Sequence, residues 1–298
     1  MVGLGKMGAS MTLRLCRGGH HVVIFDVNPE AVSGVTELTA NATRTNSLED
    51  LVSKLEPPRA VWVMVPSGEI TESTIDALSE FLDEGDTIID GGNSRYTHSM
   101  DHAAALKKEG IGFVDAGTSG GIWGLKEGFC LMIGAEPADY ERLEPIFATL
   151  APADGYARVG SPGAGHFTKM VHNGIEYALM EAYGEGFDIL ANSDFDLKVD
   201  EIAEVWRHGS VVRSWLLDLA ASALEKDPGL EHISGIVEDS GEGRWTVETA
   251  IDQGTPAPAI ATALFNRFAS RREDTFSNRM IAALRHEFGG HAVQPRER

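Results

Sequence analysis

Short apolar runs rich in valine and isoleucine alternate with stretches of helical spacing over roughly the first 160 residues. The runs that predict buried strands are 22–25, 60–65, 87–90 and 111–114. The stretches between them that predict helices include 47–54, 70–82 and 97–108. Because parallel strands need crossover connections, usually helical, this alternation predicts a parallel sheet with helices on both faces.

The strand signal disappears from about residue 165 onward, and long helical patterns replace it. We expect helices over 165–191, 199–223, 245–252, 260–270 and 275–288. The loop Gly160-Ser161-Pro162-Gly163 lies between the two regions, and 298 residues is about twice a common domain length. We therefore predict an α/β domain over 1–161 and an all-helical domain over 162–298.

The charge balance excludes several classes of function. Asp and Glu number 45 against 25 Lys and Arg, which gives a formal net charge of −20. A nucleic-acid-binding protein needs a basic surface for the phosphate backbone, and an anionic membrane would repel this chain. We therefore expect no nucleic-acid partner and no membrane binding. The acidic excess predicts a well-solvated surface, with adaptation to high salt as the alternative.

Cysteine usage and apolar run lengths indicate a cytoplasmic protein. Cys16 and Cys130 are too few for a disulfide framework and form no zinc-binding cluster, so we expect both to be small buried hydrophobic residues. No run approaches the roughly 18 apolar residues of a membrane span, and no secretory signal is visible. We expect no metal site.

A glycine motif stands at the start of the chain, where Gly3-Leu4-Gly5-Lys6-Met7-Gly8 matches G-x-G-x-x-G. A helical pattern follows, and then a strand that ends at Asp26, about 20 residues further on, where the acid that binds the adenosine ribose is expected. The glycines permit a tight turn and let backbone N–H groups approach a pyrophosphate. We predict a Rossmann-type doubly wound domain whose dinucleotide site includes Gly3, Gly5, Lys6, Met7, Gly8 and Asp26. Because only Met1-Val2 precede Gly3, we expect either that the recorded start is late or that the first strand is stunted.

Asp26 also predicts the choice of cofactor. A carboxylate beside the ribose repels a 2′-phosphate, whereas readers of NADP usually place an arginine there. The next residues, Val27-Asn28-Pro29, supply no cation. We therefore predict NAD, with NADP as the alternative.

Polar loops follow three of the predicted strands. Val65-Pro66-Ser67-Gly68 and Asp90-Gly91-Gly92-Asn93-Ser94 each end a buried strand, and Asp115 to Gly121 follow another. Ligands of open α/β sheets lie beyond the carboxyl ends of the strands. We expect Val65 and Asn93 near the nicotinamide, and Ser119 with its glycines to suit a carboxylate. The alternatives are an ordinary turn asparagine and a flexible loop.

The densest chemistry lies on the first predicted helix of the second region. Lys169, His172, Asn173 and Glu176 stand at i, i+3, i+4 and i+7, which puts all four on one helical face. The alternative is a solvated stripe with a lysine–glutamate ion pair worth a few tenths of a kcal/mol. The stripe begins beside the predicted domain junction, and this position favours a catalytic role.

These motifs resemble decarboxylating 6-phosphogluconate dehydrogenase in its short-chain form, within the β-hydroxyacid dehydrogenase superfamily. The resemblance covers essentially the whole chain. The glycine motif, Ser119-Gly120-Gly121, Lys169 and Asn173 are shared with the wider superfamily. The more specific segments are His172 to Tyr177, Gly243-Arg244-Trp245-Thr246, Phe265-Asn266-Arg267 and Arg285 to His291.

The resemblance implies oxidation of the C3 hydroxyl of 6-phosphogluconate by hydride transfer to NAD(P)+, then loss of CO2 to give ribulose 5-phosphate, a step of the pentose phosphate pathway. Lys169 matches the family's base, and it must be neutral to accept a proton, so a lowered pKa is expected. Its protonated form then polarises the keto group. Glu176 matches the acid that protonates C1, and Asn173 completes the catalytic set.

The resemblance also assigns substrate contacts. The positions that match those holding the carboxylate and hydroxyls are Asn93, Ser119, Gly120, Gly121, His172 and Asn173. The positions that match the phosphate pocket are Tyr177, Arg244, Thr246, Arg267 and Arg285. At Arg244 the family often has lysine, and residues 239–243 depart from the long-form signature. The tail that carries Arg285 and His291 is implied to reach a partner subunit's site, so a homodimer or homotetramer is expected.

Two other classes of function keep part of this pattern. Another β-hydroxyacid dehydrogenase or an imine reductase would keep Lys169 and Asn173 but would not need His172, Glu176 or the arginines. A non-catalytic NAD-binding regulatory protein would have no reason to keep a lysine and a glutamate on one helical face.

Overall fold

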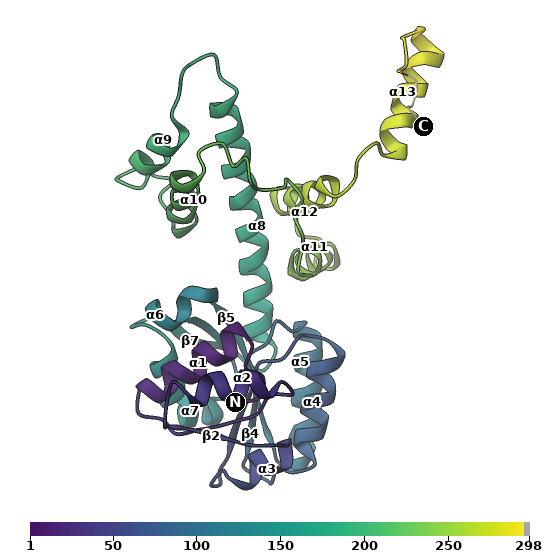
Figure 1. The fold of residues 1–298 in the computed structure, drawn as a ribbon. Helices are drawn as coiled ribbons and strands as arrows, with labels where there is room; N and C mark the ends of the chain where they lie inside the picture. Colours follow the sequence, from purple (N-terminus) through teal and green to yellow (C-terminus); the bar gives the residue numbers. More distant parts are fainter. Residues whose placement is uncertain (295–298) are drawn as a thin grey trace. The chain divides into compact units, whose positions relative to one another are not determined.

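The computed structural model describes residues 1–294 of the chain (Figure 1). The described chain forms two compact units, Met1–His172 and the described residues from Asn173 onward. The units meet inside one helix, so the domain boundary at residues 161 and 162 stays a prediction. Within the described residues, no helix is both long and apolar enough to cross a membrane.

The first unit is built on parallel strands joined by helices. Its elements are α1 (Lys6–Arg17), β1 (Val22–Ile24), α2 (Pro29–Thr36), β2 (Ala42–Arg44), α3 (Leu48–Ser53), β3 (Ala60–Val63), α4 (Glu69–Ser79), β4 (Thr87–Asp90), α5 (Tyr96–Leu106), η1 (Lys107–Glu109), β5 (Gly112–Ser119), η2 (Gly121–Trp123), α6 (Gly124–Glu127), β6 (Cys130–Gly134), α7 (Pro137–Leu150) and β7 (Tyr156–Gly160). One sheet has the order β3-β4-β5-β6-β7, and β1 pairs with β2. The predicted fold class is confirmed, although α2, β2, β6, α7 and β7 were not among the predicted elements.

The first residues of the chain join the two sheets. Val2 forms parallel bridges with both Phe25 and Val63. Its N–H donates to the Trp62 carbonyl (2.8 Å), and its own carbonyl accepts from Met64 (2.7 Å). Val2 thus occupies the strand position between β1 and β3.

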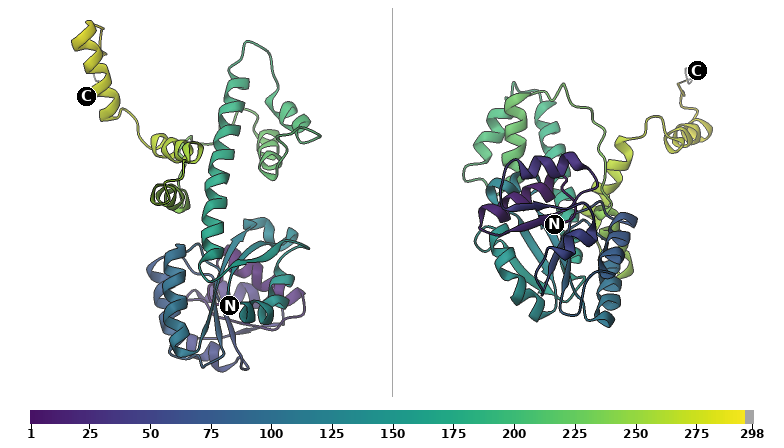
Figure 2. Two further views of the ribbon diagram at one scale, coloured as in Figure 1. Left: turned by 180° about the vertical axis from the view of Figure 1, so that it is seen from behind. Right: turned by 60° about the horizontal axis from the view of Figure 1, so that its bottom comes forward.

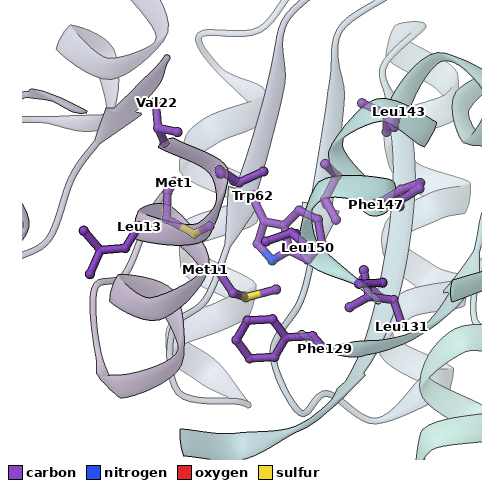
Figure 3. Close-up of a cluster of buried hydrophobic side chains, with 14 of the residues drawn as sticks. Met1, Met11, Leu13, Val22, Trp62, Phe129, Leu131, Leu143, Phe147 and Leu150 are labelled. Atoms are coloured by element: carbon purple, nitrogen blue, oxygen red, sulfur yellow. The ribbon is translucent and has the colours of Figure 1, made fainter. Parts of the chain in front are cut away.

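Alternating side chains bury both faces of the sheet, as a period of two requires. Trp62 and Ile89 point into a core shared with α1 and α7, where Trp62 packs edge-on against Phe147 with 6.2 Å between the ring centroids (Figure 3). Val61 and Ile88 point into the opposite core, which is covered by α3, α4 and α5. In both turned views of Figure 2, the blue helices α4 and α5 lie on one side of the sheet and the purple α1 on the other.

Two strands depart from the all-parallel prediction, because β7 pairs parallel with β6 and therefore shares its reversed direction. β6 runs antiparallel to β5, with Asp115 opposite Gly134 and Ser119 opposite Cys130. The connection of residues 120–129 is shorter than the dozen or so residues that a parallel crossover needs. The same pairing extends β5 to Ser119, well past the predicted end at 114. It also leaves Cys130 exposed, so the prediction of two buried cysteines is right only for Cys16.

Helices are the only regular elements in the described part of the second unit. Its elements after α8 (Ala164–Ala191), which begins in the first unit, are α9 (Val199–Trp206), α10 (Trp215–Lys226), α11 (Glu242–Asp252), α12 (Pro258–Ser270) and α13 (Phe276–Gly289). The single helix predicted over 199–223 is wrong. Gly209 has a φ of +83°, which breaks the helix, and the Ser214 hydroxyl caps α10 by accepting from Leu217 N–H (3.1 Å).

The core beneath α7 should be the main source of stability in the first unit. Phe147 is fully buried, so Phe147→Ala removes a large apolar surface and leaves a cavity. We expect a loss of about 3–5 kcal/mol in the free energy of unfolding, measured by urea denaturation with far-UV circular dichroism. Val27→Ala is the control, because Val27 is 90% exposed and should change stability by no more than about 0.5 kcal/mol. Equal stability of the two variants would contradict this assignment.

Candidate active site

The three motif glycines have three different physical roles. Gly3 has a φ of +89°, and a Cβ there would overlap the Met64 carbonyl. A Cβ on Gly8 would overlap the Gly3 carbonyl, so Gly8 allows α1 to pack closely on the turn. A Cβ on Gly5, in contrast, would meet no atom within 4 Å. Gly5 is also the N-cap of α1 and supplies no capping side chain, which leaves open space in front of the first helical N–H groups.

Asp26 is fixed beside this turn by two backbone donors. Leu4 N–H donates to its Oδ2 (2.6 Å), and Asn28 N–H donates to its Oδ1 (2.7 Å). The carboxylate therefore lies next to the glycine turn, as a contact to a ribose hydroxyl requires. Of the other residues predicted for the cofactor, Lys6 is exposed and Met7 is half-buried at the start of α1.

The loops after β3 and β4 lie at the same edge of the sheet as the glycine turn. Val65 Cγ1 is 3.0 Å from the place that a Cβ on Gly3 would occupy. Buried Asp90 shapes the next loop by accepting from Gly92 N–H (3.0 Å) and from the Ser94 hydroxyl (2.6 Å), and half-buried Asn93 lies between them. The first unit thus gathers Gly3, Val65 and Asn93 in one region.

A buried carboxylate anchors the start of α8. Asp115, on β5, accepts from the N–H groups of Gly163 (2.6 Å) and His166 (2.7 Å), which are donors at the N-terminus of that helix. Burial raises the pKa of the Asp115 carboxyl, while the charge of His166 and the backbone donors act in the opposite direction. The His166 ring is also buried, and its Nδ1 hydrogen-bonds the Ser99 hydroxyl (2.7 Å).

Glycines let α8 approach the sheet closely enough to place Lys169. A Cβ on Gly117 would lie 2.6 Å from Lys169 Cβ, and a Cβ on Gly165 would overlap the carbonyls of Asp115 and Met132. Lys169 is consequently buried against β5, the strand that ends at Ser119. Gly120 and Gly121, at φ values of +135° and +50°, turn the chain after Ser119.

The remaining residues of the predicted stripe follow along the same helix. α8 is continuous from Ala164 to Ala191, so Lys169, His172, Asn173 and Glu176 keep their one-face spacing. Asn173 is buried, and His172 and Glu176 are half-buried. Seven residues of rise separate Lys169 from Glu176 by about 10 Å along the axis.

In the second unit, two glycines bring α8 and α11 together. A Cβ on Gly174 would lie 2.7 Å from Thr246 Cγ2, and one on Gly243 would lie 2.5 Å from the Tyr177 ring. Tyr177 and Thr246 are both buried, and the Thr246 hydroxyl donates to the Glu242 carbonyl (2.7 Å). Two residues predicted for the phosphate pocket thereby meet at this helix crossing.

Three arginines lie over the rings of Tyr177 and Phe268, and the sequence predicts two of them. The Arg267 guanidinium lies over the Tyr177 ring at 3.5 Å, and it donates to the Glu238 carbonyl (2.9 Å). Arg244 and Arg271 both lie over the ring of Phe268, at 4.5 and 5.4 Å from its centroid. We call Arg244, Arg267 and Arg271 the arginine cluster.

Several residues that organise these sites were missed by sequence reasoning. Asp115, Gly117 and His166 lie in segments for which other roles were predicted. A charged residue directly after an apolar strand was the signal that could have identified Asp115. Arg271 stands four residues after Arg267 on the same helical spacing, which was the available signal for it. Asp239 gave no such signal.

Two predicted residues lie apart from the arginine cluster. Arg285 is on α13 and His291 follows that helix, and both are exposed. His286 Nδ1 donates to the His291 carbonyl (2.9 Å). In the described part of the chain, the structure does not bring either residue to Tyr177.

A doubly wound domain has a dinucleotide turn and a lysine buried against its sheet, and the helical unit that follows has an arginine cluster. Together these features define a nucleotide-dependent dehydrogenase of anionic substrates. Comparison with family models agrees. Residues 1–160 match the NAD binding domain of 6-phosphogluconate dehydrogenase, and residues 165–287 match the 6-phosphogluconate dehydrogenase C-terminal domain. The chain belongs to the 6-phosphogluconate dehydrogenase family.

Two relatives match over nearly their whole length, and a solved structure matches over part of its own. The protein YqeC of Bacillus subtilis (strain 168), to which this enzyme name is given provisionally, is 47% identical over 99% of this chain and 98% of its own. The NAD(+)-dependent, decarboxylating 6-phosphogluconate dehydrogenase of Haloferax volcanii is 42% identical over 98% of this chain and 97% of its own. The solved structure of a Plasmodium falciparum 6-phosphogluconate dehydrogenase has the same fold, with a TM-score of 0.84 at 24% identity, over 100% of this chain and 66% of that one.

The close contact between α8 and the sheet should not tolerate a side chain at Gly165. Gly165→Ala forces a methyl group against two carbonyl oxygens, so we expect a loss of about 1–3 kcal/mol in the free energy of unfolding. Gly184→Ala on the same helix is the matched control, because its Cβ would meet no atom within 4 Å. That substitution should stabilise by about 0.5–1 kcal/mol. Urea denaturation of both variants measures the difference, and a neutral Gly165→Ala would contradict the predicted clash.

Proposed function

We propose that this protein is an NAD-dependent 6-phosphogluconate dehydrogenase that oxidises and decarboxylates 6-phosphogluconate to ribulose 5-phosphate and CO2. The observation that carries the proposal is the arginine cluster over Tyr177 and Phe268. Tyr177 lies on the helix that also holds the buried Lys169. Arginine suits a phosphate monoester because its planar fork donates two hydrogen bonds at once. The relative from Haloferax volcanii bears the name of this activity.

The residues of the first unit fit a bound dinucleotide. The open space at Gly5 admits a pyrophosphate to the N-terminus of α1, and the Asp26 carboxylate is held where it can accept from ribose hydroxyls. When bound, the nicotinamide ring supplies the hydride acceptor for the oxidation. Asp26 also disfavours a 2′-phosphate, so NAD is the proposed cofactor and NADP the second choice.

The side chains of α8 supply the proton transfers. Neutral Lys169 removes the proton of the C3 hydroxyl, and its ammonium form then donates a hydrogen bond to the new keto oxygen. That hydrogen bond draws electrons toward the carbonyl as the carboxylate leaves as CO2. Glu176 donates the proton that C1 of the resulting enediol takes up. Asn93, Ser119, Gly120, Gly121, His172 and Asn173 hold the carboxylate and hydroxyl groups.

An oligomer is part of the proposal. Large apolar side chains on α13 are exposed within the described chain: Phe276, Met280, Ile281 and Leu284. Exposed apolar faces of this size are usually covered by another surface. We propose a homodimer or homotetramer in which the tail bearing Arg285 and His291 completes a neighbouring subunit's site. The cytoplasmic location expected from the sequence stays a prediction.

The function is tested by paired spectrophotometric assays of NADH or NADPH formation together with detection of CO2. We expect turnover of 6-phosphogluconate with equimolar CO2, a higher kcat/KM with NAD than with NADP, and a much lower kcat/KM with unphosphorylated gluconate. Oxidation without CO2 would support another β-hydroxyacid dehydrogenase instead. A complete lack of turnover with any hydroxyacid would support the regulatory protein.

Removing each proposed proton carrier should stop a different step. Lys169→Ala should lower NADH formation by at least about 100-fold, the usual contribution of a general base, while NAD binding measured by calorimetry is retained. Glu176→Gln should impair ribulose 5-phosphate formation by about the same factor. Residual NADH formation near the wild-type rate in Lys169→Ala would refute the role of Lys169.

A further inference from the structure

One carboxylate is shared between two members of the arginine cluster. Asp239 Oδ2 accepts from Arg244 Nε (2.6 Å), and its Oδ1 accepts from Arg244 Nη2 (3.1 Å) and from Arg271 Nη2 (2.7 Å). The Asp239 side chain is only 3% exposed, although both of its partners reach solvent. A buried carboxylate is costly unless it is paired, and Asp239 is paired twice.

Arg244 and Arg271 each keep N–H donors that these hydrogen bonds do not use. A guanidinium has five N–H donors, so Arg244 uses two of them on Asp239 and keeps three. Arg271 uses one on Asp239 and one on Glu238 Oε2 (2.6 Å), and also keeps three. Both guanidinium groups also lie over Phe268, which limits their rotation. Each arginine is therefore oriented by the protein while it still has donors to offer to an anion.

The three positive charges of Arg244, Arg267 and Arg271 have carboxylates of different exposure beside them. Asp239 and Glu238 accept hydrogen bonds from Arg244 and Arg271, and the charge of Glu248 also acts on Arg244. The Glu238 carboxylate is 75% exposed, so water and salt screen it more than they screen Asp239. Arg244 and Arg271 lower the pKa of Asp239 to about 2, so this carboxylate stays ionised at any working pH.

We propose that Asp239 is a positioning residue that aligns Arg244 and Arg271 toward one phosphate group, and that Arg271 is a further phosphate-binding residue. This proposal rests on the proposed function, because it assigns residues to the phosphate of a sugar acid. Without Asp239, the two like charges repel each other and lose their common orientation. With Asp239 in place, the remaining N–H donors of the two arginines converge on one phosphate dianion, as bidentate recognition of phosphate requires.

The test compares Asp239→Asn and Arg271→Gln with Arg272→Gln, which removes the same charge one residue away on an exposed side chain. We expect the first two variants to raise the KM for 6-phosphogluconate by about tenfold or more, the loss of one good charged contact, with kcat and the KM for NAD little changed. Arg272→Gln should leave all three constants within about twofold of the wild type. Arg271→Lys, which keeps the charge but loses the fork, should recover part of the loss.

Binding of inorganic phosphate, measured by calorimetry on the unmodified full chain and on each variant, separates this proposal from the proposed function. We expect the Kd for phosphate to rise about tenfold in Asp239→Asn and Arg271→Gln. If the wild type binds phosphate in this way but does not turn over 6-phosphogluconate, the proposed function fails and the phosphate site stands. If Arg271→Gln changes neither the KM nor the phosphate Kd, the proposal is overturned, whether or not Asp239→Asn folds.

Discussion

The buried contact between Asp115 and the N-terminus of α8 is the interaction on which the rest of the structure depends. A helix N-terminus carries partial positive charge and free N–H groups, so it stabilises a carboxylate that burial would otherwise penalise. The same strand, β5, ends at Ser119 and makes room for Lys169 through Gly117. One strand therefore fixes both the loop after Ser119 and the proposed base, and a change at Asp115 would displace them together.

Electrostatics sets the second constraint. The chain has a formal charge of −20, and a sugar acid with one carboxylate and one phosphate carries about −3 near neutral pH. The overall field repels such a substrate, so capture has to come from local cations. In the proposed site the arginine cluster supplies them, and Asp239 holds Arg244 and Arg271 by hydrogen bonds. Salt should weaken the overall repulsion more than these short contacts, because exposed, distant charges are screened most.

Features that depend on local spacing were predictable from the sequence, whereas helix breaks and strand directions were not. The glycine turn, Asp26 and the stripe on α8 were predictable because each depends on spacing within one turn, strand or helix. The single helix predicted over 199–223 failed because apolar periodicity continued across Gly209 while the backbone did not. The antiparallel β6 was missed because the direction of a strand depends on the length and path of the preceding loop. Exposure of Cys130 followed from that pairing.

By itself, the sequence determined the alternation of strands and helices, the dinucleotide turn and the one-face spacing of Lys169, Asn173 and Glu176. These features arise from residues that are close in the chain, where backbone geometry leaves few options. Only the tertiary structure decided that Asp115 holds α8 and that Asp239 joins Arg244 to Arg271. Such pairs bring together distant segments through burial and hydrogen bonding, and their strength depends on the exclusion of water, which no local pattern encodes.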